Sequence, residues 1–512
     1  MRWGVYSWLL SPDDFWRLTY TVRYLLGILM LGVVVLFHEF GHYLAALKNG
    51  VAVIELSFGF GPRLLSHVSK KSGIRYSWKL IPFGGSCEML GEYDDEEDGY
   101  DEKNVEEDTA TRDTGSDTAG KDEKRDAHGD DGEEPAISKD FSENRYDAPV
   151  RTGSKGCTFQ QAALWRRAII VAAGPVFNFI LALLAAFIIV AATGETRAIV
   201  GSVETGSPES EAGLQAGDEI IRFDGHRVLN AEDLYLNLVL YGTSTDTVDV
   251  TVRRDGEKIN LFYTPETQTR WMLGFHYADA SEENGVQITQ LQKDSALRDA
   301  GAQTGDVIKA INGTEITDSE GLQTYLQENP LDGSAVDVTV RRGSRTYTLE
   351  NVKPRESLSA VNQFSIDWTP EKQNLFGVIK YGFVELGYWI STVWKTLGGL
   401  VSGLFTINDF SGPVGIVKMV GDTYAETAQT VSVAAGLLTL LEMLCMISAN
   451  LGVMNLIPFP ALDGGKLLSY LIEAIRHKPV SQKVLYYVEM TGFVLLLAFS
   501  AYVTIHDIFR YI

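Results

Sequence analysis

The sequence predicts a polytopic α-helical membrane protein with about four transmembrane helices, two inserted extracytoplasmic α/β domains and a membrane-associated β-hairpin element. Four apolar stretches are each long enough to cross a bilayer, which takes roughly 20 helical residues. Between the second and third stretches the chain repeats itself, which indicates two copies of one small domain. An apolar content of 45% suits membrane segments joined to soluble modules.

The first apolar stretch, residues 24–47, contains a metal-binding motif. His38 and His42 are four residues apart, so on a helix they share one face and can bind one Zn²⁺ ion, with Glu39 beside it as a general base. Ionisable groups inside a membrane helix are costly unless they are paired or metal-bound. This context favours a catalytic site over the alternative, polar side chains that only face a helix bundle.

A basic loop follows this stretch. Its cations are Lys48, Arg63, Lys70, Lys71, Arg75 and Lys79. The positive-inside rule therefore places the loop in the cytoplasm and the N-terminus outside. No cleavable signal is evident, because the first stretch carries the motif and must be retained. Glycine and proline clusters within residues 51–92 predict short strands and tight turns, which could offer an edge to an extended peptide or form a hairpin without a substrate role.

An acidic insertion comes next. Residues 92–147 hold 23 Asp and Glu against 7 Lys and Arg, which accounts for most of the net charge of −23. With so few apolar residues this tract cannot bury enough surface to fold, so we expect it to be disordered. Asp94 to Asp98 lacks the EF-hand pattern. The three scattered cysteines indicate neither a disulfide framework nor a cysteine metal site, and we expect no nucleic-acid partner.

The second apolar stretch, residues 168–193, includes Gly174, Pro175 and Asn178. A small residue, a kink and a buried amide could let this helix pack closely on the catalytic helix, although an ordinary helix contact would explain the same residues. Cations before the stretch place its start in the cytoplasm and its end outside.

The internal repeat covers residues 201–354 with an offset of 88 residues. Matching pairs are Ala212-Gly213 with Ala300-Gly301, Gly217-Asp218 with Gly305-Asp306, Asp224-Gly225 with Asn312-Gly313, and the six residues Asp249 to Arg254 with Asp337 to Arg342. Each copy combines strands, glycine turns and a helix in an order that resembles the PDZ domain. That module binds peptides by adding a ligand strand beside one of its own, so peptide or protein ligands are expected.

Residues 374–407 are apolar but interrupted by Lys380, Glu385 and Lys395 at helical spacings, which predicts an amphipathic helix on the membrane surface. Unlike a further membrane crossing, a surface helix also keeps the segment Asn455 to Gly465 on the same side of the membrane as the motif that contains His38 and His42. The predicted segments are 1–50 (first transmembrane helix), 51–92 (β element), 93–155 (acidic cytoplasmic insertion), 156–196 (second helix), 197–270 and 271–356 (two PDZ domains), 357–425 (membrane-surface region) and 426–512 (third and fourth helices).

The third stretch, residues 430–456, ends in a segment that runs from Asn455 to Gly465 with two prolines and two glycines. This segment breaks the helix and fixes Asp463 at membrane depth, where irregular backbone is tolerated only if it lines a cavity. Asp463 is therefore the predicted third zinc ligand. The competing carboxylates are Glu442, Glu473, Glu489 and Asp507. None of them lies in a segment with comparable prolines and glycines. The fourth stretch is residues 484–505.

Together these motifs resemble the site-2 protease family of intramembrane zinc metalloproteases, and most closely its bacterial regulator-of-sigma-E protease branch with tandem PDZ domains. The resemblance spans nearly the whole chain and also includes Gly59 to Pro62, Pro82 to Gly85, Met89 to Glu92, Gly174 to Asn178 and Ser411 to Ile416. The acidic insertion departs from the short loop of better-known members, so no role is transferred to it.

The resemblance implies that His38, His42 and Asp463 bind zinc and that Glu39 is the base. Asn455 is expected to hold the substrate backbone, and Gly84 and Gly85 belong to a β element that clamps an unwound substrate helix. The expected substrates are single-span proteins or membrane stubs in a bacterial inner or plasma membrane. Two other classes remain: an envelope peptide sensor or scaffold with a vestigial metal site, and a metal transporter, which would need further intramembrane ligands.

Overall fold

The computed structural model describes residues 12–92, 157–280, 284–292, 294–402, 404–405 and 411–511. The whole of the predicted acidic insertion, 93–155, lies outside these residues. The helices of the membrane part are α1 (Pro12–Lys48), α2 (Leu164–Thr193), α7 (Leu375–Ser402), α8 (Pro413–Thr430), α9 (Val433–Leu456), α10 (Asp463–Arg476) and α11 (Gln482–Tyr511).

Four segments in the described part of the chain are long and apolar enough to cross a membrane. They are Arg23–Lys48, Leu164–Thr193, Val433–Leu456 and Lys483–Ile505. These segments agree with the four predicted apolar stretches and make the chain a multi-pass membrane protein. Helix α1 begins at Pro12 and is therefore longer than the first apolar stretch, residues 24–47.

The β element consists of two long bent strands, β1 (Val53–Val68) and β2 (Arg75–Met89), instead of several short ones. The middle of β1 is flanked by β2 on both sides, since Phe58 pairs with Gly85 and also with Trp78. The hairpin therefore folds back into a four-segment sheet, and residues 85–89 form the edge segment nearer α1. Glycines with positive φ, including Gly59 and Gly84, permit the bends.

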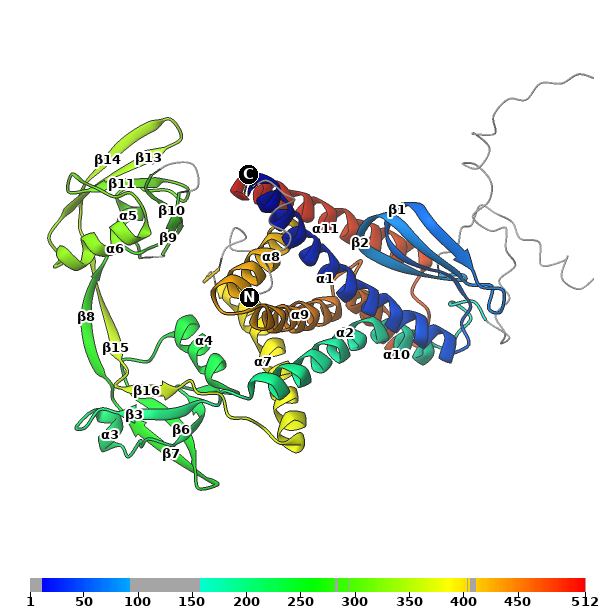
Figure 1. The fold of residues 1–512 in the computed structure, drawn as a ribbon, viewed down its shortest axis with the longest axis horizontal. Helices are drawn as coiled ribbons and strands as arrows, with labels where there is room; N and C mark the ends of the chain where they lie inside the picture. Colours follow the sequence, from blue (N-terminus) through cyan, green and yellow to red (C-terminus); the bar gives the residue numbers. More distant parts are fainter. Residues whose placement is uncertain are drawn as a thin grey trace, which may run out of the picture.

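The extramembrane part contains two small α/β domains (Figure 1). The first contains β3 (Ile199–Val203), α3 (Pro208–Glu211), β4 (Glu219–Phe223), β5 (His226–Arg227), α4 (Ala231–Tyr241), β6 (Val248–Arg254) and β7 (Glu257–Tyr263). The second contains β9 (Phe275–Asp279), β10 (Val286–Leu291), α5 (Ala296–Asp299), β11 (Val307–Ile311), β12 (Thr314–Glu315), α6 (Ser319–Glu328), β13 (Val336–Arg342) and β14 (Arg345–Val352).

The repeated sequence pairs have matching structural roles in the two domains. Asp218 is buried and makes a bidentate ion pair with Arg254. Asp306 is likewise buried and pairs with Arg342 in the same way. Each aspartate thus ties the glycine turn to the neighbouring strand, which is why these residues recur at one offset.

The second domain is inserted within the first. β16 (Phe364–Asp367) follows the second domain in the chain but pairs with β3 at the edge of the first sheet, whose order is β16-β3-β4-β6-β7. A two-stranded ribbon of β8 (Glu266–Met272) and β15 (Arg355–Val361) carries the chain out and back (Figure 1). The range 357–425, expected to be a membrane-surface region, therefore includes two strands of the extramembrane part. The repeat cannot reveal this, because the completing strand comes after both copies.

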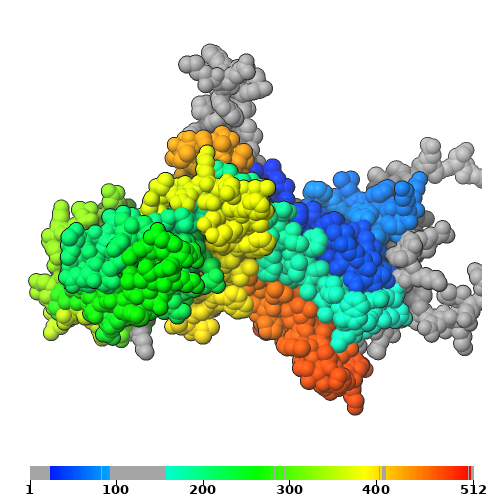
Figure 2. Space-filling model, turned by 90° about the horizontal axis from the view of Figure 1, so that it is seen from below, coloured from blue at the N-terminus to red at the C-terminus, as the bar shows by residue number. Residues whose placement is uncertain are grey.

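Helix α7 separates the first domain from the membrane helices. It contacts α2, α9 and α4 and runs across the ends of α2 and α9 rather than beside their full length (Figure 1). In the view of Figure 2 its yellow surface lies between the green first domain and the rest of the helices. A buried ion pair from Lys395 of α7 to Asp233 of α4 fastens the domain to it.

Candidate metal centre

Three side chains from two distant parts of the chain meet in the helical region. The Nε2 atoms of His38 and His42 lie 3.1 Å apart, and Asp463 Oδ2 lies 3.2 Å and 3.4 Å from them, respectively. The two imidazoles come from α1, and the carboxylate comes from the start of α10. Among the described residues this is the group of His, Cys, Asp and Glu side chains whose spacing could hold a metal ion.

The three donor atoms fit a zinc ion. Ligands about 2.0 to 2.1 Å from a tetrahedral zinc ion lie about 3.3 Å from one another, close to all three observed separations. Asp463 Oδ2 is buried and accepts no hydrogen bond from the described residues. Lone pairs from three side chains therefore face one point, an arrangement that is unfavourable without a shared cation or proton.

The backbone of α2 fixes the tautomer of His42. Its Nδ1 donates to the carbonyl oxygen of Ile170 at 2.9 Å, and the histidine is buried. With the proton on Nδ1, the Nε2 lone pair is free to bind a metal. No sequence pattern indicates this contact, because the acceptor is a main-chain atom 128 residues away.

Two asparagines lie beside the other histidine. Asn178 Nδ2 is 3.2 Å from His38 Nδ1, and Asn455 Nδ2 is 3.5 Å from the same atom. Asn178 is fully buried, and its Oδ1 accepts no hydrogen bond from the described residues. Turning this amide by half a rotation would let Oδ1 accept from Nδ1–H, which is the tautomer that a metal on Nε2 requires.

Glycines make room for the centre at the contact between α1 and α2. A Cβ on Gly174 would lie 2.3 Å from His42 Nε2, and one on Gly41 would lie 2.4 Å from the Ala173 carbonyl oxygen. Of the two alternatives left open for the second stretch, the structure therefore shows close packing on the catalytic helix. Gly174 and Asn178 also border the centre itself, which their sequence pattern did not indicate.

The general-base candidate, Glu39, faces the β element. The Cys87 backbone lies beside its carboxylate. A Cβ on Gly85 would lie 3.0 Å from Glu39 Cγ, and one on Gly84 would overlap the Phe60 ring. The edge segment of the β element thus reaches the centre, and the two predicted glycines lie where a side chain would clash.

The segment before α10 is held by close backbone contacts. Added Cβ atoms on Gly464 and Gly465 would meet the carbonyl oxygens of Ile457 and Phe459 at 2.2 and 2.4 Å. Ala461 has a φ of 71°. This compact turn places Asp463 at the first position of α10.

The competing carboxylates lie elsewhere. Glu473 pairs with Arg167 at 2.9 Å, and Asp507 accepts from the Gly415 backbone N–H at 2.8 Å at the start of α8. Neither Glu442 nor Glu489 belongs to the donor group found in the described residues. Lys466 of α10 pairs with Glu92 at 2.7 Å, which links the end of the β element to the helix that carries Asp463.

Comparison with known proteins agrees with this site. The model of Peptidase family M50 matches residues 26–499. The regulator of sigma-E protease RseP of Escherichia coli is 28% identical, over 94% of this chain and 97% of that protein. The regulator of sigma-W protease RasP of Bacillus subtilis is 26% identical over 94% and 97%, respectively. The zinc metalloprotease RasP of Geobacillus kaustophilus is 26% identical with the same coverage.

A solved structure of the HtrA3 PDZ domain bound to a phage-derived ligand matches 18% of this chain and 93% of that chain, with 20% identity and a TM-score of 0.16. At that score the match adds nothing to the description of the two domains, which rests on their own strand order.

Proposed function

The chain belongs to peptidase family M50 and is a zinc-dependent metalloprotease of the site-2 type; we propose that His38, His42 and Asp463 are its zinc ligands and that Glu39 is its general base. The observation that carries this proposal is the convergence of three metal-binding atoms beside a carboxylate at the contact of two membrane helices. Three protein ligands leave a fourth position for a reacting group, as catalytic zinc requires.

Zinc bound at these residues supplies Lewis acidity, which polarises the scissile carbonyl and makes water nucleophilic near neutral pH. The proton from water goes to the Glu39 carboxylate, which then delivers it to the leaving amine. The edge segment of the β element lies against this side chain at Gly85. Ile170 and Asn178 orient the two imidazoles through their Nδ1 atoms, so these groups act on the ligands rather than on the substrate.

The substrate enters as an extended strand beside the edge segment of the β element, residues 85–89. Gly85 has no side chain, so the edge segment lies directly against Glu39, and Gly84 leaves room for the Phe60 ring behind this segment. The amide of Asn455 holds the substrate backbone on the other side of the centre. Since helical hydrogen bonds shield a scissile peptide, the substrates are single-span membrane segments with helix-weakening residues, as in regulated intramembrane proteolysis.

The metal centre lies toward the cytoplasmic side and the two PDZ-like domains lie outside, a topology that the cations after α1 and before α2 support. In this arrangement the domain pair acts as a size filter that excludes substrates with bulky outer domains. The attachment of the domain pair supports this role. Glu195 and Glu371 exchange two backbone hydrogen bonds of 3.0 Å, so the chain leaves the membrane part and returns to it at one point.

The shared attachment point allows a clean excision. Residues 196–370 are replaced by a short Gly-Ser linker, which joins two backbones that already pair. Removing the repeat alone, residues 201–354, would instead leave β15 and β16 without their partner strands. We measure cleavage of two membrane substrates that share one transmembrane segment, one with a short outer tail and one with a folded outer domain. The expected result is cleavage of both by the excised protein and of the short one alone by the full chain.

Loss of cleavage of both substrates by an excised protein that still inserts and binds zinc would overturn the filter role but not the protease assignment. The Glu39→Gln variant of the excised protein is the matched control, because it keeps the same fold and should cleave neither substrate.

A further inference from the structure

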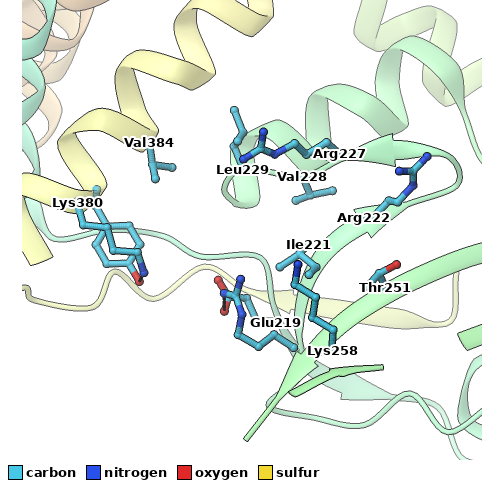
Figure 3. A pocket seen from close by; sticks show the side chains of 12 residues that line it. Glu219, Ile221, Arg222, Arg227, Val228, Leu229, Thr251, Lys258, Lys380 and Val384 are labelled. Carbon is cyan, nitrogen blue, oxygen red and sulfur yellow. Dashed lines mark hydrogen bonds and ion pairs between the residues drawn. The ribbon is translucent and has the colours of Figure 1, made fainter. Parts of the chain in front are cut away.

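A pocket of about 560 Å³ lies between the first domain and α7, away from the metal centre. One wall is the outer face of the first sheet, since the inward-facing Ile220 and Val252 alternate with pocket residues on β4 and β6. The other wall is α7. In Figure 3, Lys380 and Val384 come from the α7 side, and Glu219, Arg227 and Lys258 come from the domain.

The pocket is strongly cationic. Its lining contains Arg222, Arg227, Arg253, Lys258 and Lys380 and a single carboxylate, Glu219. That carboxylate is already engaged by Arg253 at 2.7 Å and by Arg197 at 3.5 Å. Arg227 and Lys258 are exposed, and their side chains make no hydrogen bond or ion pair with the residues that the structure describes. Several cations around one neutralised acid form a site for an anion.

The second domain provides an internal comparison, because it has the same strands at an offset of 88 residues but does not pack on α7. Its counterparts of Arg222, Arg227 and Lys258 are Ala310, Glu315 and Thr346. The fold itself therefore does not require these cations. They occur in the copy that faces the membrane-surface helix, which points to a local ligand rather than to domain stability.

The cationic pocket continues into an apolar groove. A neighbouring pocket of about 400 Å³ shares Arg227, Leu229 and Val384 with it and runs along α7 past Phe383 and Ile390. Its one carboxylate, Asp233, is ion-paired with Lys395. The first turn of α7 exposes Leu375 and Phe376, at 72% and 81%, as a helix seated in a lipid surface would.

We propose that this composite pocket binds an anionic phospholipid, with the headgroup phosphate on Arg227 and Lys258 and an acyl chain along the apolar groove of α7. Phosphate is the chemistry that these cations recognise, and the groove selects a lipid over a soluble phosphate. A bound lipid would hold the first domain against α7 at the outer membrane surface. This inference does not depend on the zinc site or on proteolysis.

The test uses the purified full chain in an uncharged detergent, with phosphatidylglycerol added and bound lipid counted by native mass spectrometry. The Arg227→Gln/Lys258→Gln variant removes two exposed cations that have no partner in the described structure, so it should fold normally. The matched control, Arg270→Gln/Arg345→Gln, removes two exposed cations from β8 and β14 and the same total charge.

We expect about a tenfold or greater loss of phosphatidylglycerol affinity in the pocket variant, the effect of losing at least one charge-assisted hydrogen bond, and no loss in the control. Equal retention by the wild type and the pocket variant would overturn the proposal. Competition with inorganic phosphate separates the two sources of phosphate. Resistance of the bound lipid supports the proposal, whereas displacement at millimolar concentration would assign the pocket to a soluble phosphate and overturn the lipid assignment.

Discussion

Gly174 of α2 lies so close to His42 of α1 that a Cβ atom on the glycine would be 2.3 Å from Nε2, the nitrogen that faces the metal centre. The same Cβ would lie 2.8 Å from His38 Cε1. Two membrane helices from separate parts of the chain can therefore meet at the proposed zinc site because Gly174 has no side chain.

Substituting Gly174 by alanine should displace both imidazoles and lower zinc content and cleavage together. The relevant measurement is the zinc-to-protein ratio of the purified variant, because that ratio isolates metal binding from later steps. Gly398→Ala in α7 is the control, since an added Cβ meets nothing within 4 Å there. Full zinc occupancy in Gly174→Ala would show that the helices can separate without loss of the site.

Asn178 and Asn455 both approach His38 Nδ1, but their alanine variants should lose different properties. Asn178→Ala removes a buried group that orients a metal ligand, and such losses typically lower metal affinity by about 10 to 100-fold. Asn455→Ala should leave zinc affinity nearly unchanged and raise KM, because its proposed partner is the substrate backbone. Zinc titration and cleavage kinetics on both variants distinguish these roles, and a zinc affinity of Asn178→Ala equal to that of the wild type would remove it from the centre.

Stability outside the membrane helices should fall as pH rises. Burial raises the pKa of Glu195 to about 8, and the neighbouring Glu385 and Glu232 carboxylates add to this shift. Burial likewise raises the pKa of Glu385 to about 7. Because the folded chain holds these protons more tightly than the unfolded chain, the stabilisation is full below the ordinary pKa of 4.5 and is lost as pH rises to about 8.

The check for this effect is the melting temperature of the full chain at pH 6 and pH 9. Glu195→Gln mimics the neutral acid, so the decrease in melting temperature between the two pH values should be smaller in this variant than in the wild type. Equal decreases would mean that Glu195 does not titrate in this range, with Arg197 and Lys380 neutralising it instead.

The three proposed zinc ligands, whose donor atoms the structure brings together, could be selected from the sequence because each carries local information: two histidines at helical spacing, and an aspartate that follows prolines and glycines. Asn178 was not assigned to the site, because a buried amide in a membrane helix looks the same whether it orients a ligand or packs a bundle. The pairing of β16 with β3 was also hidden, since strand partners separated by about 160 residues leave no periodic pattern. The doubled pairing of Phe58 depends on bends that glycines permit but do not specify.

The most direct test of the account measures zinc content and cleavage of a membrane substrate for Glu39→Gln and Asp463→Ala from matched purifications. Glu39→Gln keeps the size of the side chain but cannot accept a proton, so zinc should stay bound while cleavage falls by about 10² to 10⁴-fold. Asp463→Ala removes one of three protein ligands, so zinc and cleavage should fall together. Full zinc occupancy in Asp463→Ala, or near-normal cleavage by Glu39→Gln, would contradict the proposed centre.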